Sequence, residues 1–117
     1  MAIPAYMWIK DDQGSEIEGS VSIADREGSI EVLHFDHELR IPTDGDTGSL
    51  TGTRKHEPFV FTKGFDSASP YLYKACSNGQ TLKELVLRWF RIDDTGTEKE
   101  YFRHTLKDVK ITSVKPV

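Results

Sequence analysis

The side chains best suited to chemistry are histidines and nearby carboxylates. His34, Asp36 and His37 lie close together in the sequence. Residues three positions apart point to opposite faces of a β-strand, so His34 and His37 cannot share a metal ion if this segment is extended. Asp36 could orient a histidine of a catalytic triad, but no serine lies in a G-x-S-x-G motif. The pattern therefore favours a protein that is not an enzyme.

Patterns for metal binding are also incomplete. Asp44 and Asp46 lie in a glycine-rich segment that is similar to the start of a calcium loop, but the glutamate that completes such a loop is absent. His56 and His104 are far in sequence from each other. The single cysteine, Cys76, rules out an internal disulfide and a cysteine-based zinc site. We expect no metal and no other cofactor.

The composition indicates one globular domain over residues 1–117. Hydrophobic residues make up 37% and charged residues 29% of the chain, and the net charge of −4 argues against nucleic acid as a partner. The N-terminus lacks the basic and apolar regions of a signal peptide, and no stretch has the ~20 apolar residues of a membrane-spanning helix. We therefore expect synthesis in the cytoplasm and no insertion into a membrane.

A short helix is predicted over about residues 70–78. Pro70 suits the first turn of a helix, and Asp66 and Ser69 offer oxygen acceptors just ahead of it. Gly79 can take the left-handed conformation that ends a helix. A helix this short is not stable alone, so we expect it to pack on a sheet. Cys76 then lies on the apolar side of the helix as a small buried side chain.

Period-two hydrophobic patterns predict a mainly β fold. Turn residues separate the patterns, and the clearest hairpin signal is Asp93–Gly96. The architecture predicted is a β-barrel or two-sheet sandwich with one short lateral helix. The predicted strands cover residues 5–10, 16–23, 29–41, 59–62, 81–92, 98–106 and 108–114.

The predicted strand over residues 29–41 changes character along its length. Leu33, Phe35 and Leu39 share one face, which we assign to the core. His34, Asp36 and Glu38 then point away from the core. The following residues, 42–53, are rich in glycine and small polar residues around a lone leucine, Leu50, and are predicted to project as a loop or hairpin tip.

Residues 54–91 resemble the haemolysin-coregulated protein (Hcp) family, the tube subunits of type VI secretion systems. The resemblance is carried by Arg54-Lys55-His56, Thr62-Lys63 ahead of Asp66, Ser69-Pro70 at the helix start, and Ala75-Cys76 ahead of Gly79. The segments MAIPAYMWIK, GSIEVLHFDHELRIP and TLKDVKITSV also match, so the resemblance extends over nearly the whole chain. It marks Lys63, Asp66, Ser69, Pro70, Cys76 and Gly79 as residues of the family motif.

The resemblance implies a fold like that of phage tail-tube proteins and a structural function. Six subunits would form a ring, and stacked rings would form a tube that carries effectors in its lumen and is secreted without a signal peptide. The expected partners are other copies of the chain, the spike and sheath proteins, and effectors. Family members usually continue past this point with strands that complete the barrel, so the chain is expected to lack those strands.

Two groups of residues take roles from this resemblance. Asp44, Asp46, Leu50 and Thr51 would contact a neighbouring ring. His34, Asp36 and Glu38 would line the lumen, or else face outer solvent or a neighbouring subunit. An alternative is a monomeric β-barrel adaptor that binds a protein partner along an exposed edge strand.

Overall fold

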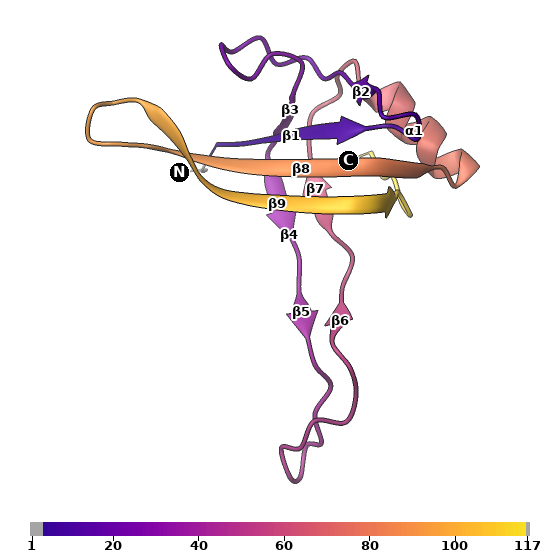
Figure 1. The fold of residues 1–117 in the computed structure, drawn as a ribbon. Coiled ribbons are helices and arrows are strands. Elements are labelled where there is room, and N and C mark those ends of the chain that lie inside the picture. Colours follow the sequence, from indigo (N-terminus) through magenta and orange to yellow (C-terminus); the bar gives the residue numbers. More distant parts are fainter. Residues whose placement is uncertain (1–3, 117) are drawn as a thin grey trace.

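The computed structural model describes residues 4–116. It consists of a long antiparallel sheet, a helix at one end of the sheet and a β-ribbon that projects far from it (Figure 1). The helix is α1 (Ser69–Asn78). The strands are β1 (Ala5–Lys10), β2 (Glu16–Ile17), β3 (Ile30–Val32), β4 (His34–Asp36), β5 (Leu39–Arg40), β6 (Lys55–His56), β7 (Val60–Thr62), β8 (Thr81–Ile92) and β9 (Glu98–Lys110).

The sheet is built around β8, which pairs with β1 on one side and β9 on the other. Both pairings are antiparallel, and the β1–β8 register places Ala5 opposite Trp89 and Ile9 opposite Leu85. On its other side β1 pairs with both β2 and β3. The turn between β8 and β9 closes at Asp93, whose N–H donates to the carbonyl oxygen of Thr97 at 2.9 Å, which confirms the predicted hairpin.

The hydrophobic core lies on one face of this sheet. Alternation in β1 and β8 sends every second side chain to that face, where Met7, Ile9 and Leu87 are completely buried. Helix α1 covers the same face through Leu72 and Ala75. Burial of this apolar surface is what holds a helix of ten residues in place.

The bounds of the helix agree with the prediction, and its two ends are built differently. At its end Gly79 is left-handed, with φ of 61°, as predicted. At its start the N-cap is Ala68, which has no capping side chain. The carboxylate of Asp66 instead accepts the N–H of Ala68 at 3.0 Å, one residue ahead of the first turn. Cys76 is half-buried, so it lies at the edge of the core and not within it.

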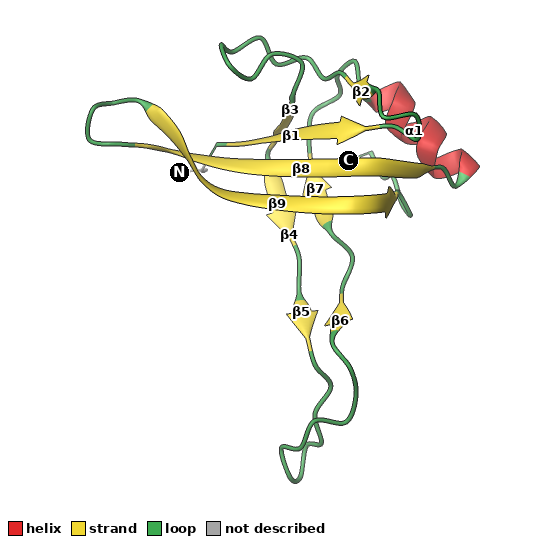
Figure 2. Cartoon of the chain, in the orientation of Figure 1, coloured by secondary structure: helices red, strands yellow, loops and turns green. Residues whose placement is uncertain are grey.

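The predicted strand over residues 29–41 is broken in the structure. Only β3 belongs to the large sheet, because the chain leaves that sheet at Leu33 and continues as β4 and β5 in the projecting ribbon (Figure 2). The prediction that Leu33 and Leu39 belong to the core was wrong, since they are 59% and 54% exposed. Leu33 precedes the ribbon, and Leu39 lies in β5, beyond the part of the ribbon that packs against the core at Phe35.

Two other predicted strands are also altered. Of residues 16–23 only β2 forms a ladder, and the chain then makes a close loop in which a Cβ atom on Gly19 would lie 2.3 Å from the carbonyl oxygen of Ser29. The separate strand predicted over residues 108–114 is absent from the described residues 4–116. Strand β9 runs on to Lys110 through Asp108, which has a positive φ of 56°.

Truncation of a core side chain should reduce the free energy of unfolding much more than truncation of a side chain of the ribbon. We expect Leu87→Ala to lower the free energy of unfolding by about 3 kcal/mol, because it leaves a cavity between β8, β1 and α1. Leu50→Ala is the matched control, since Leu50 is 67% exposed, and should change it by less than about 0.5 kcal/mol. Urea denaturation followed by circular dichroism measures both values, and equal losses would contradict the assignment of the core.

Candidate assembly surfaces: the projecting arm and its base

Residues 34–62 form a β-ribbon that we call the arm. Strands β4 and β5 run outward and β6 and β7 return, with His34 opposite Thr62 and Leu39 opposite His56. Figure 1 shows the arm standing almost perpendicular to the strands of the sheet. A two-stranded ribbon is marginally stable by itself in water. The position of the arm must therefore be set at its base.

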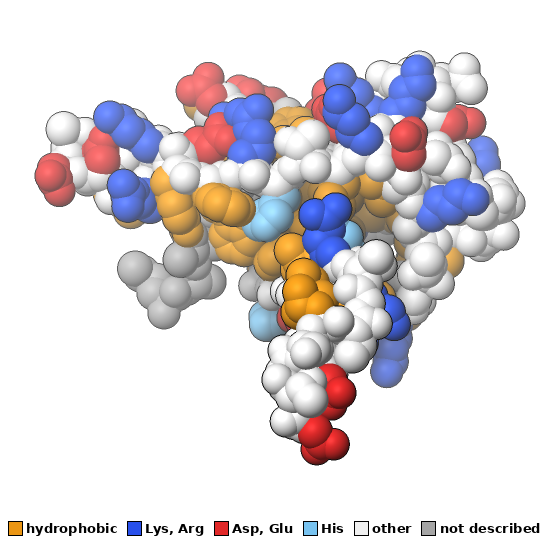
Figure 3. All heavy atoms as spheres, turned by 60° about the horizontal axis from the view of Figure 1, so that its bottom comes forward, with side chains coloured by type: hydrophobic (Ala, Val, Ile, Leu, Met, Phe, Trp, Pro, Cys, Tyr) orange, Lys and Arg blue, Asp and Glu red, His pale blue; other side chains and the backbone are white. Residues whose placement is uncertain are grey.

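The tip of the arm is an ordered turn. The N–H of Thr51 donates to Pro42 at 2.9 Å, and the N–H of Asp44 donates to Ser49 at 2.7 Å. The carboxylate of Asp44 accepts the N–H of Asp46 at 2.8 Å, so its role within the chain is to support the turn. Leu50 is 67% exposed at the same tip. Figure 3 shows acidic side chains at the end of the arm, beyond a hydrophobic side chain.

The two faces of the arm base differ as the alternation predicts. His34, Asp36 and Glu38 are exposed, whereas Phe35 and its partner Phe61 are half-buried against the core. The structure thus brings the three predicted polar residues to one open surface. That surface is separate from the tip, and its assignment to a lumen stays a prediction.

An aromatic joint connects the inner face of the arm to β8 and β9. We use this name for Phe35 and Phe59 of the arm together with Trp89 and His104 of the sheet. Phe35 lies 4.5 Å from Phe59, 5.5 Å from Trp89 and 5.2 Å from His104, between ring centroids. Nε1 of Trp89 donates a hydrogen bond to Nδ1 of His104 at 3.1 Å. Burial lowers the pKa of His104, and repulsion from His37 lowers it further.

Local sequence patterns do not predict this joint. The alternation of the last long strand does place Phe102, His104 and Leu106 on one face, which was the available signal. Their contact with Phe35 depends on where the chain leaves the sheet at Leu33, and local patterns do not reveal that point.

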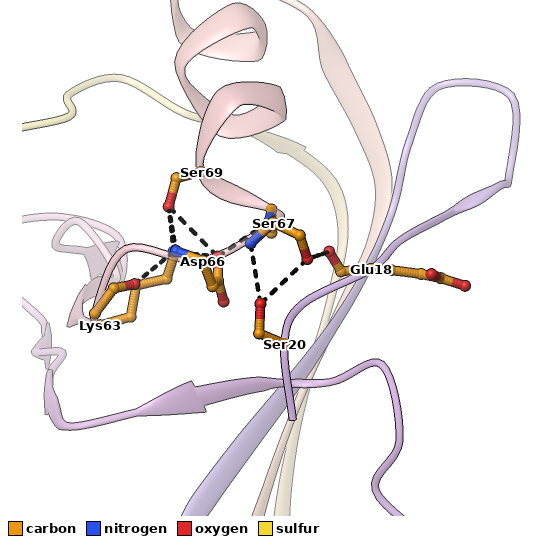
Figure 4. Close-up of polar contacts among 8 residues, drawn as sticks. Glu18, Ser20, Lys63, Asp66, Ser67 and Ser69 are labelled. Atoms are coloured by element: carbon orange, nitrogen blue, oxygen red, sulfur yellow. Dashed lines mark hydrogen bonds and ion pairs between the residues drawn. The ribbon is translucent and has the colours of Figure 1, made fainter. Parts of the chain in front are cut away.

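A second set of contacts holds the returning strand of the arm, where β7 leads into α1. We call it the polar joint, and it comprises Lys63, Asp66 and Ser69. Nζ of Lys63 lies 2.8 Å from the carboxylate of Asp66 and 2.9 Å from Oγ of Ser69, and it also donates to the carbonyl oxygen of Gly64 at 3.0 Å (Figure 4). The side chains of Lys63 and Asp66 are only 11% and 12% exposed. A buried ammonium of this kind is stable because three oxygens surround it.

Ser67 extends this joint to the loop after β2. Its hydroxyl donates to the carbonyl oxygen of Glu18 at 2.9 Å, and its N–H donates to Oγ of Ser20 at 3.1 Å (Figure 4). The motif residues Lys63, Asp66 and Ser69 thus come together, while Pro70 and Gly79 mark the two ends of the helix and Cys76 lies on its half-buried side. In this structure the motif supports the fold between the arm and the helix.

Loss of the polar joint should destabilise the protein. We expect Asp66→Ala to reduce the free energy of unfolding by about 3 kcal/mol, because the buried ammonium of Lys63 loses its counter-ion. Arg40→Ala is the control, since the Arg40–Glu57 pair is largely exposed and should contribute little. Guanidinium denaturation gives both values.

A double variant distinguishes charge from packing at the polar joint. Lys63→Met combined with Asp66→Leu removes both charges, and should recover much of the stability lost in Asp66→Ala. If Asp66→Ala and Arg40→Ala had equally small effects, the joint would not hold the arm to the helix.

Residues 4–116 contain neither a metal-binding cluster nor a membrane-spanning helix. They contain no group of three or more His, Cys, Asp or Glu side chains placed to hold a metal ion. They also contain no helix long and apolar enough to cross a bilayer.

The fold and these surfaces define a class of protein: a mainly β protein with a helix on its sheet and a long projecting arm. Residues 6–117 match the family described as "Type VI secretion system effector, Hcp". The chain belongs to this Hcp family, as the sequence resemblance predicted. Hcp is a structural family of type VI secretion and not an enzyme family.

Individual relatives support the same membership. The "Major exported protein" of Pseudomonas aeruginosa is 38% identical over 124 residues, covering 98% of this chain and 72% of that protein. The solved structure of a mutant Hcp1 protein from E. coli EAEC 042 superimposes with a TM-score of 0.93 at 59% identity, covering 99% of this chain and 78% of the other. Secreted Hcp3 from Pseudomonas aeruginosa gives a TM-score of 0.80 at 31% identity, covering 97% and 76%.

Proposed function

We propose that this chain is the structural subunit of a type VI secretion tube. Its copies assemble into hexameric rings, the rings stack into the inner tube, and the lumen carries effectors. The observation that carries this proposal is the arm, an ordered ribbon that extends away from the core and exposes Leu50 at its tip. Because such a ribbon buries little within its own chain, a contact with another copy supplies a reason for its form.

The tip is the proposed contact with a neighbouring ring. Leu50 supplies an apolar anchor, and Asp44 and Asp46 supply hydrogen-bond acceptors around it. Thr51 keeps the returning strand paired through its bond to Pro42. A ring needs a head-to-tail interface that closes by rotation, and stacking needs a second, separate surface. The tip lies at the far end of the arm from the sheet, so it can form that second surface separately from the ring interface.

The lumen is the proposed position of the exposed face with His34, Asp36 and Glu38. A polar wall makes shallow contacts at many places and does not trap a bulky cargo. The other partners are the spike and sheath proteins. The subunit is cytoplasmic before firing and is then exported, and the name of its relative, the "Major exported protein", supports the export.

Particle mass and shape test this proposal. Light scattering after gel filtration should give a mass six times the 13.3 kDa of one chain, and electron microscopy should reveal hollow rings. Leu50→Glu should leave the ring mass unchanged and reduce stacking, because it places a third carboxylate at the tip beside Asp44 and Asp46. Ile92→Glu is the matched control, since Ile92 is similarly exposed, at 64%, but lies outside the arm. Stacks of Leu50→Glu as long as those of Ile92→Glu would contradict the role of the tip.

A second candidate function is a monomeric adaptor that binds a protein by strand addition. The observation in its favour is β9, which within the described residues pairs with β8 alone and leaves its other edge open. Tyr101 and Phe102 are exposed along this strand, at 43% and 54%. This candidate predicts a mass of one chain in solution and saturable binding of one extended peptide, whereas rings would exclude it.

A further inference from the structure

His104 lies where the arm meets the sheet. Its ring is 5.2 Å from Phe35 of β4, 5.8 Å from Phe59 just before β7, and 4.9 Å from Phe102 of its own strand. The imidazole therefore contacts both halves of the arm from the sheet side. A change in this side chain therefore affects its contacts with both parts of the arm.

The hydrogen bond from Trp89 requires His104 to be neutral. The indole N–H can only donate, so Nδ1 of His104 must accept at 3.1 Å, and the imidazole proton must lie on Nε2. Protonation adds a hydrogen to Nδ1. Two donors then face each other at this distance, and the bond is lost. The two states of the imidazole thus have opposite effects on the same contact.

The surrounding side chains offer no counter-ion to a charged imidazole. No carboxylate forms an ion pair with His104 anywhere in residues 4–116. The titratable group that acts on it from the arm is His37, which is stacked on His56 with ring centroids 5.7 Å apart.

The charged groups of the neighbouring strands lie on the other face. The carboxylate of Glu100 accepts from Arg88 at 2.9 Å and from Arg103 at 2.7 Å, and the alternation of β9 places Arg103 opposite in direction to His104. Hydrogen bonds from Arg103 lower the pKa of Glu100 to about 2, so this cluster keeps its charges in mildly acidic solution. It does not contribute to a change near neutral pH.

We propose that His104 is an acid-sensitive latch that holds the arm against the sheet when neutral and releases it when protonated. This device is internal to the chain and does not depend on ring assembly. Because the pKa of His104 in the folded chain is lowered below the ordinary 6.5, its contribution is complete above about pH 6.5. It is lost as the pH falls from there through the lowered pKa.

Hydrogen exchange of the arm amides tests the latch. We would measure β4 and β7 amides at pH 7.5 and 5.5, corrected for intrinsic exchange, with the monomeric and assembled fractions measured separately. Protection in the arm should fall at pH 5.5 by up to about tenfold, because that pH lies one unit below the ordinary pKa of histidine and the loss cannot exceed this difference. The indole N–H resonance of Trp89, identified by its absence in Trp89→Phe, should shift over the same pH range.

Two variants separate His104 from the other histidines. His104→Asn offers a side-chain oxygen near the position of Nδ1 but does not titrate, so arm protection should become independent of pH. His34→Asn is the control on the exposed face of the same ribbon and should keep the wild-type response. Equal wild-type protection at both pH values, or a full response in His104→Asn, would overturn the proposal. If His104→Asn does not fold, the indole N–H resonance of Trp89 in the wild-type protein provides the test. A resonance that does not shift between pH 7.5 and pH 5.5 would also overturn the proposal.

Discussion

The packing of β8 between β1 and β9 is the interaction on which the other parts of the structure depend. Leu82, Leu85 and Leu87 of β8 belong to the same core cluster as Leu72 and Ala75 of α1, and further along β8 Trp89 packs against Phe35 of the arm. One strand of twelve residues thus fixes the positions of the helix and the arm relative to each other. Because β8 is paired on both sides, it gives the arm a fixed base in the sheet.

Elements with local signals could be predicted from the sequence, whereas those set by distant pairings could not. Pro70 and Gly79 define the helix by their own backbone preferences, and the Asp93 turn defines the longest hairpin in the same way. The break at Leu33 has no such signal, because it arises where β3 stops pairing with β1. The exposed face of His34 and Asp36 followed from alternation alone, but the contact of Phe35 with His104 required the position of that break.

The arm base is held by two joints of different physical character. The polar joint depends on a full charge, the ammonium of Lys63, surrounded by oxygens from Asp66, Ser69 and Gly64. The aromatic joint depends on ring packing and one neutral hydrogen bond. The first ties the returning strand to the helix, and the second ties both strands to β8 and β9. The family motif contains the residues of the first joint.

The pairing of β1 with β8 also determines the order in which the chain can fold. Strand β1 leaves the ribosome early, but its long partner is made only after the arm and the helix. Until then Met7 and Ile9 have only the short strands β2 and β3 beside them. The hairpin of β8 and β9 is local and can form quickly, whereas closing β1 onto it is a distant and slow step. The nascent chain therefore exposes an apolar strand until β8 has been made, and an exposed strand of this kind is prone to aggregation.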